Sequence, residues 1–225
     1  MADARVRAEG MTGHERIAHG VAWGWLLCAV VGVADARDQP RAAQTIVAFG
    51  DSLTAGSGVS SEDAYPSRLE RRLRDEGYAY RVVNAGVSGE TTAGGLRRVD
   101  WVLKSRPNLV ILELGANDGL RGLSPEQTRD NLARIIERLR AAGATVLLAG
   151  MRVPPNYGDE YARAFEALFP ELAHRYHLPF IPFFLDGVAT EPALNQADGL
   201  PPTADGYRVI VERIWPRIRP LLTRP

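Results

Sequence analysis

The sequence is poor in cysteine, lysine, net charge and long apolar runs. Cys28 is the one cysteine among 225 residues, so an internal disulfide is excluded and a cysteine-based metal site is disfavoured. The 27 basic and 27 acidic residues balance, and every basic residue except Lys104 is an arginine. No basic tract stands out, so we expect no nucleic-acid partner. A hydrophobic share of 45% and a charged share of 24% are typical of a globular protein.

The longest apolar or small-residue run, Val21–Val33, has 13 residues. A bilayer-spanning helix needs about 20 residues, whereas the apolar core of a secretory signal is this short. Ala34-Asp35-Ala36 is an A-x-A cleavage site. We therefore expect a leader at 1–36 and a mature domain at 37–225 that is periplasmic or secreted from a bacterium, with no stable membrane span. An uncleaved membrane anchor is the alternative.

Short apolar strands alternate five times with amphipathic helices along the rest of the chain. The expected strands cover 45–49, 81–84, 109–112, 145–149 and 180–181, and the expected helices cover 65–76, 96–103, 125–142, 159–176 and 204–218. Continuous apolar strands joined by helices predict a parallel sheet that is covered on both faces. The fold class is therefore α/β, a three-layer α/β/α sandwich around a five-stranded parallel sheet. Ligands bind such sheets at the carboxyl ends of the strands.

Three strand ends carry residues suited to chemistry. The first ends in Gly50-Asp51-Ser52, which predicts a tight turn with an exposed serine hydroxyl. The second leads into a glycine-bearing loop, 84–92, whose backbone N–H groups can approach a ligand. The third is followed by Asn117, whose side chain can donate to an oxyanion. Each feature alone is also explained by a turn, a loop or a helix cap, but parallel strands bring all three to one edge of the sheet.

Together these stretches resemble the SGNH hydrolases, the GDSL esterase/lipase family, and in particular the bacterial thioesterase I, lysophospholipase and arylesterase group. The resemblance is carried by GDSLTAG, VVNAGVSGETT, LELGANDGLRG and PPNYG, in the family's order and spacing. It implies the flavodoxin-like SGNH hydrolase fold and a small acyl ester or thioester as substrate. It implies no cofactor and no metal, and we expect a monomer.

The resemblance also implies roles for individual residues. Ser52 would be the nucleophile, and its backbone N–H would form an oxyanion hole with the Gly89 N–H and the Asn117 side chain. Attack on an ester or thioester carbonyl creates a tetrahedral oxyanion, which fixed N–H donors stabilise. Four further residues would line the acyl-binding groove: Asp118, Gly119, Leu120 and Pro155.

The base that should activate the serine is missing. The family carries Asp-x-x-His near its C-terminus, and here the matching residues are Asp198 and Pro201. Proline cannot accept the serine proton. His174 and His177 lie before the last strand, at the end of the sheet opposite Ser52, and we interpret them as surface residues. Three explanations are open: a natural variant that has lost most hydrolysis, a codon altered by one base, or another group that replaces the imidazole.

The residues therefore support two function classes. The first is a serine esterase or thioesterase that works through an acyl-enzyme and is impaired by Pro201. The second is a catalytically silent acyl- or lipid-binding protein with the same fold. A flavodoxin-like cofactor binder ranks last, because the sequence has no phosphate-binding loop.

The leader assignment predicts where the exported protein begins. N-terminal sequencing of the exported form should start close to Arg37, because signal cleavage follows the A-x-A site. A soluble mature form that still carries residues 21–33 would contradict this assignment.

Overall fold

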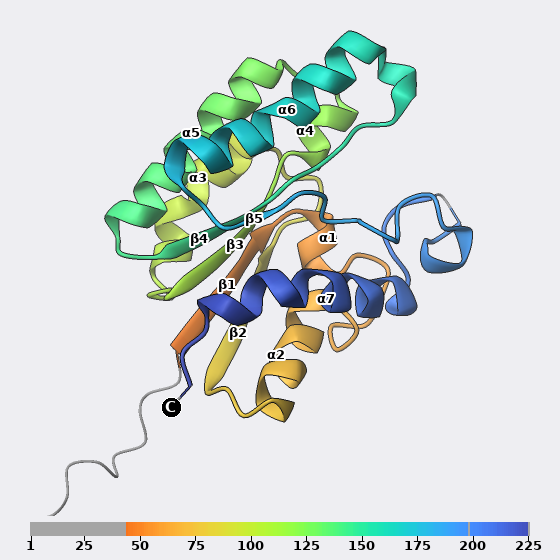
Figure 1. Ribbon diagram of the computed structural model, residues 1–225. Helices are drawn as coiled ribbons and strands as arrows, with labels where there is room; N and C mark the ends of the chain where they lie inside the picture. Colours follow the sequence, from red (N-terminus) through yellow and green to blue (C-terminus); the bar gives the residue numbers. More distant parts are fainter. Residues whose placement is uncertain (1–43, 198, 225) are drawn as a thin grey trace, which may run out of the picture. The chain divides into compact units, whose positions relative to one another are not determined.

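The computed structural model describes residues 44–197 and 199–224, so the expected leader and Asp198 lie outside the described residues. The described strands form one parallel sheet in the order β2-β1-β3-β4-β5 (Figure 1). Their bounds are β1 Gln44–Gly50, β2 Tyr80–Gly86, β3 Leu109–Glu113, β4 Thr145–Ala149 and β5 Phe180–Ile181. This strand order is the flavodoxin-like one, which confirms the predicted fold class.

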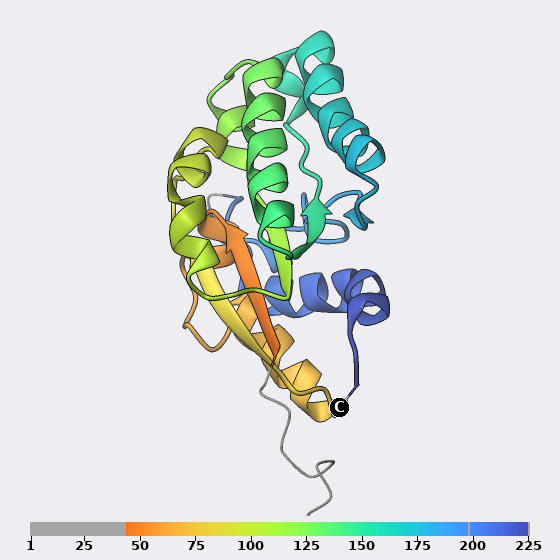
Figure 2. The same ribbon diagram turned by 90° about the vertical axis from the view of Figure 1, so that its left-hand side faces the viewer.

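Helices cover both faces of the sheet. Figures 1 and 2 show α3, α5 and α6 on one face and α2 and α7 on the other. The helices are α1 Ser52–Ala55, α2 Tyr65–Asp75, α3 Thr92–Leu103, α4 Ala116–Leu120, α5 Pro125–Ala141, α6 Asp159–Tyr176 and α7 Ala204–Ile218, with 3-10 turns η1 Pro155–Tyr157, η2 Pro192–Leu194 and η3 Arg219–Leu221. None of the described helices is long and apolar enough to cross a membrane.

The central strands are buried on both faces, which explains why they are apolar without alternation. Residues 46–49 of β1 and 110–112 of β3 are fully buried. Helix α5 begins at the predicted residue, Pro125, and Ser124 caps it: the Ser124 hydroxyl accepts from the Gln127 N–H at 3.2 Å. The same hydroxyl donates to Glu126, and no described hydrogen bond joins the Gln127 side chain back to Ser124.

Two short helices at the strand ends were not predicted. The turn after β1 continues as α1, whose first residue is Ser52, and Asn117 lies in α4 rather than in an open strand end. Asp51 caps α1, and its Oδ1 accepts from the Leu53 N–H at 3.0 Å. Helices of four and five residues are too short to show an apolar repeat, so periodicity could not reveal them.

Helix α1 packs directly on the end of β2. A Cβ at Gly86 would lie 2.2 Å from the Ala55 nitrogen and 2.6 Å from its Cα. Both atoms belong to the backbone, so neither can move aside as a flexible side chain would. Glycine at position 86 therefore allows α1 to approach the sheet.

Gly86→Ala should destabilise the protein by about 1–3 kcal/mol, because the new methyl group must displace the backbone of α1. Urea unfolding measures this change. Val87→Ala is the matched control in the same loop, since Val87 is 45% exposed and its replacement should cost under about 0.5 kcal/mol. Equal stability of Gly86→Ala and the parent protein would contradict the packing described here.

Candidate active site

Ser52 lies at the carboxyl end of β1, on the first residue of α1. Its side chain is half-buried, and no other described residue forms a hydrogen bond with its hydroxyl. The first N–H groups of a helix have no partner within that helix. The Ser52 N–H is one of these groups and is available to bind an anionic oxygen.

The Asn117 side chain reaches the turn that carries Ser52. Its Nδ2 donates to Asp51 Oδ2 at 3.0 Å, while the other oxygen of Asp51 accepts from the Leu53 N–H. The buried Asp51 carboxylate therefore joins the start of α1 to α4. A side-chain amide has two N–H bonds, so Asn117 keeps a second donor after binding Asp51.

Gly89 lies in the exposed loop that follows β2. Its φ of +77° is in the left-handed region, which glycine adopts without the strain other residues would suffer. Its carbonyl accepts from Arg121 Nη2 at 2.8 Å, and its N–H has no acceptor among residues 44–197 and 199–224. The Gly89 carbonyl is thus held by a hydrogen bond, while the Gly89 N–H is available to a ligand.

Three of the four residues expected to line the acyl-binding groove differ in exposure. Asp118 is buried, and its carboxylate accepts from the Thr92 N–H at 2.8 Å, so this side chain faces the interior. Gly119 is also buried, whereas the side chain of Leu120 is 40% exposed. Pro155 begins the turn η1.

Two tyrosines that the sequence did not single out hold the segment after α4. The Tyr157 hydroxyl donates to the Leu120 carbonyl at 2.7 Å, and the Tyr161 hydroxyl donates to the Leu123 carbonyl at 2.8 Å. Both bonds leave the side chains of Leu120 and Leu123 partly exposed, at 40% and 37%. Tyr157 belongs to the PPNYG stretch, which was the available signal.

Pro201 lies in the loop that follows η2. This loop is attached to the segment after α1, because Gln196 Nε2 donates to the Ser57 carbonyl at 3.0 Å while the Gln196 N–H donates to the Pro201 carbonyl at 3.0 Å. The two described histidines are elsewhere. His177 caps the C-terminus of α6, one turn after His174, and α6 ends just before β5 begins. Both are exposed at the amino end of the sheet, opposite Ser52.

A second carboxyl group is buried beside Asp51, and sequence reasoning missed it. Glu113 ends β3 in register with Gly50, and its Oε2 accepts from the Thr54 hydroxyl at 2.6 Å. Burial, followed by the nearby Asp51 charge, raises the pKa of Glu113 well above its ordinary value. Burial also raises the pKa of Asp51 to about 6. Asp51 accepts two N–H bonds and is ionised at neutral pH, whereas burial favours the protonated form of Glu113.

The surroundings of Glu113 are buried, which disfavours its charged form. The hydroxyls of Tyr65 and Tyr207 and the Oε1 of Glu113 are buried, and none has a hydrogen-bond partner among the described residues. Glu113 closes an otherwise apolar strand, and an acid at the end of a buried strand was the signal that could have revealed it.

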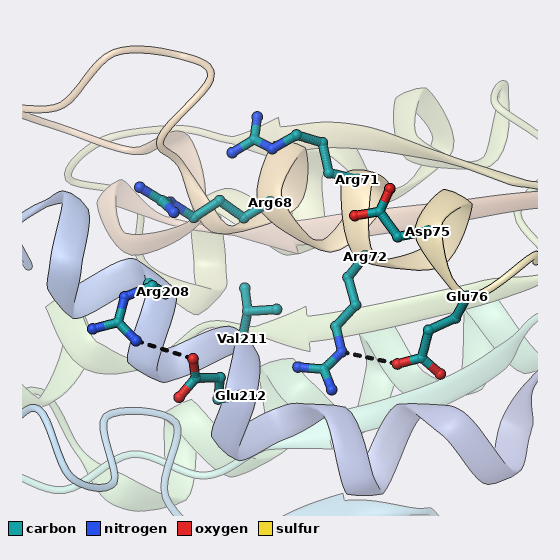
Figure 3. A pocket seen from close by; sticks show the side chains of 8 residues that line it. All are labelled: Arg68, Arg71, Arg72, Asp75, Glu76, Arg208, Val211 and Glu212. Carbon is teal, nitrogen blue, oxygen red and sulfur yellow. Dashed lines mark hydrogen bonds and ion pairs between the residues drawn. The ribbon is translucent and has the colours of Figure 1, made fainter.

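A hollow of about 340 Å³ lies on the outer surface between α2 and α7 (Figure 3). Its walls are charged and largely paired, as in the contacts Arg208–Glu212 at 3.0 Å and Arg72–Glu76 at 3.2 Å. None of the predicted site residues lines it. Within the described residues, no group of three or more His, Cys, Asp or Glu could hold a metal ion.

Comparison with known proteins identifies the architecture around Ser52. Residues 48–209 match the model of the GDSL-like lipase/acylhydrolase family. Esterase TesA of Pseudomonas aeruginosa is 45% identical over 185 residues, which cover 82% of this chain and 92% of that protein. The thioesterase 1/protease 1/lysophospholipase L1 of Escherichia coli strain K12 is 40% identical over 182 residues, covering 80% and 86%. A crystal structure of TesA, 44% identical, superposes with a TM-score of 0.77 and covers 80% of this chain and all of that one.

The buried carboxyl pair predicts how stability depends on pH. Because the pKa of Glu113 is higher in the folded than in the unfolded protein, the folded state holds a proton that the unfolded chain releases above its ordinary value of 4.5. The free energy of unfolding therefore falls as the pH rises above that value. Glu113→Gln should flatten this fall by up to about 1.4 kcal/mol per pH unit.

Urea unfolding of the parent protein and Glu113→Gln between about pH 5 and about pH 8 measures this effect. Glutamine keeps an oxygen that can accept from Thr54, so the comparison isolates the proton. Parallel pH profiles for the two proteins would show that Glu113 does not titrate as a buried acid.

Proposed function

The chain belongs to the GDSL-like lipase/acylhydrolase family, and we propose that it is a serine hydrolase of carboxylic esters and acyl thioesters. The family hydrolyses such bonds, and this chain keeps the nucleophile and oxyanion residues of its motifs. The observation that carries the proposal is the hydrogen bond between Asn117 and Asp51, which brings the proposed oxyanion donor beside the Ser52 turn.

The proposed reaction forms an acyl-enzyme. The Ser52 Oγ attacks the carbonyl carbon, and the carbonyl electrons move onto oxygen to give a tetrahedral oxyanion. The N–H groups of Ser52 and Gly89 and the free N–H of Asn117 would stabilise this charge, each contributing about 3–4 kcal/mol. Collapse of the intermediate breaks the bond to the leaving oxygen or sulfur, which takes up the proton lost by Ser52 and departs as an alcohol or thiol. Water then attacks the acyl-enzyme carbonyl, and the acid is released as Ser52 regains a proton.

The serine proton is the weak point of this scheme. A hydroxyl is a poor nucleophile unless a base removes its proton, and proline occupies the position of the family's histidine. Asp198 would have oriented that imidazole. Hydrolysis by this chain should therefore be severely impaired. Loss of the histidine from a serine triad costs up to about 10⁶ in kcat, and the oxyanion hole and substrate binding retain about 10³–10⁴ over water.

Pro201 supports a second candidate, a catalytically silent acyl- or lipid-binding protein. Such a protein would bind the acyl chain beside Leu120 without turning the ester over. We further propose that the mature chain is exported to the periplasm or the medium, on the basis of the leader pattern. Turnover of a p-nitrophenyl ester by the purified protein distinguishes the two functions.

Pro201→His should raise ester hydrolysis by at least about 10³, because it supplies an imidazole three residues from Asp198. The measurement is kcat for p-nitrophenyl butyrate, in the parent protein and in the variant. A parent protein that is already as fast as Pro201→His would contradict the prediction, since another base would then be at work.

The control for that experiment is Pro201→His combined with Ser52→Ala. This double variant should lose the gained activity, because no nucleophile is left to form the acyl-enzyme. Retention of the activity would mean that the imidazole hydrolyses the ester without Ser52, which would contradict the proposed mechanism.

A further inference from the structure

A partly buried ion pair, Glu90–Arg98, lies next to Gly89 in the chain. Arg98, on the second turn of α3, donates through Nε to both carboxylate oxygens of Glu90, at 2.8 and 2.7 Å, and its Nη2 also contacts Glu90. Only 17% of the Arg98 side chain and 8% of the Glu90 side chain are exposed. Glu90 follows Gly89 in the chain, so the pair acts on the peptide next to the proposed oxyanion donor.

The same guanidinium reaches the strand that carries the nucleophile. Arg98 Nη2 donates to the Gly50 carbonyl at 3.1 Å, and that carbonyl also accepts from the Val87 N–H at 3.1 Å. The guanidinium lies over the Phe49 ring, 4.5 Å from its centre. Arg98 therefore connects the loop that carries Gly89 with the backbone two residues before Ser52.

We propose that the Glu90–Arg98 pair is a positioning device that fixes the Gly89 N–H relative to Ser52 for transition-state binding. This inference rests on the proposed hydrolase function. Neither side chain needs to touch the substrate: Glu90 holds the loop and Arg98 holds the strand end.

The chemistry of the two side chains suits this role. A guanidinium is a flat, rigid donor that can bind a carboxylate and a carbonyl at the same time, whereas a lysine ammonium is a flexible point charge. Gly89 itself offers no resistance to rotation, because glycine adopts many backbone conformations. Its N–H direction must therefore be set by neighbouring contacts. Arg121 holds the Gly89 carbonyl on one side, and Glu90 anchors the chain on the other.

The test uses Glu90→Gln and Arg98→Lys, each made in the parent protein and in Pro201→His. Glu90→Gln removes the carboxylate charge but leaves Arg98 partly buried without its anion, which can lower stability. Arg98→Lys keeps the charge and loses the fork that reaches Gly50. Urea unfolding reports the folded fraction of each variant, so that rates are compared per folded molecule.

Two readouts are needed, and only one depends on hydrolysis. In the Pro201→His protein, kcat for p-nitrophenyl butyrate should fall about 10- to 100-fold while KM changes by less than about twofold, because only the transition state uses the displaced donor. In the parent protein, amide hydrogen exchange of Val87 and Glu90, whose N–H groups donate to the Gly50 and Val87 carbonyls, should become at least about tenfold faster, with no comparable change in β3 or β4.

The matched control is the pair Arg72–Glu76 on α2, which is also an ion pair with its guanidinium over an aromatic ring, that of Trp215. Glu76→Gln and Arg72→Lys should change neither kcat nor amide exchange at positions 87 and 90. The proposal is overturned if the Glu90 and Arg98 variants match these controls in either readout. If Pro201→His shows no hydrolysis, the proposed function fails, and the exchange experiment still decides whether the pair holds the loop.

Discussion

The buried carboxylate of Asp51 is the contact on which the site depends. It caps the first turn of α1 through the Leu53 N–H and holds the Asn117 amide through its second oxygen. Because Asp51 lies between Gly50 and Ser52, this one side chain determines how the nucleophile turn faces α4. Burial raises its pKa to about 6, so the charge that accepts these bonds is present at neutral pH.

A second buried carboxyl group, Glu113, lies beside this charge. Like charges close together in a buried region repel each other, which favours the protonated form of one of them. Burial and the nearby Asp51 charge raise the pKa of Glu113 well above its ordinary value, although its carboxyl group accepts from the hydroxyl of Thr54. Gly50 packs against this contact, since a Cβ there would lie 2.0 Å from Thr54 Oγ1, 2.3 Å from Glu113 Oε2 and 2.5 Å from the Glu113 carbonyl oxygen. The backbone of β3 and the Thr54–Glu113 hydrogen bond therefore leave room only for glycine at position 50.

The contacts that hold the proposed oxyanion donors come from residues 49–121. Asp51 holds Asn117, Arg121 holds the Gly89 carbonyl, and Arg98 joins Glu90 to the Gly50 carbonyl. The loop that should carry the base is attached next to these contacts: Gln196 donates to the Ser57 carbonyl, and the Ser57 hydroxyl is hydrogen-bonded to that of Ser88, the neighbour of Gly89. None of the three contacts that hold the donors involves Pro201, so a change at position 201 removes none of them.

The sequence predicted the regular part of this fold well. Apolar runs and helical spacing located β4, α6, β5 and α7 at their observed bounds. Helices α6 and α7 are long enough to show the helical repeat, β4 is a mostly apolar run, and β5 is an apolar pair between two prolines. The same patterns could not locate α1 and α4, which are too short to show a repeat. Nor could these patterns predict that Arg98 bonds to both Glu90 and the Gly50 carbonyl, or that Glu113 lies beside Asp51. Two of these contacts join residues 48 and 62 positions apart, and only the folded sheet brings them together.

We propose that the oxyanion site is formed without a histidine at position 201. A crystal structure of the parent protein after reaction with a fluorophosphonate tests it, because the Ser52 Oγ displaces fluoride and leaves a phosphonyl oxygen where the oxyanion would lie. We predict that this oxygen accepts from the N–H groups of Ser52 and Gly89 and from Asn117 Nδ2, each at about 2.7–3.1 Å. An adduct on Ser52 whose oxygen points away from Gly89, with the Asn117 side chain no longer bonded to Asp51, would contradict a preformed oxyanion site.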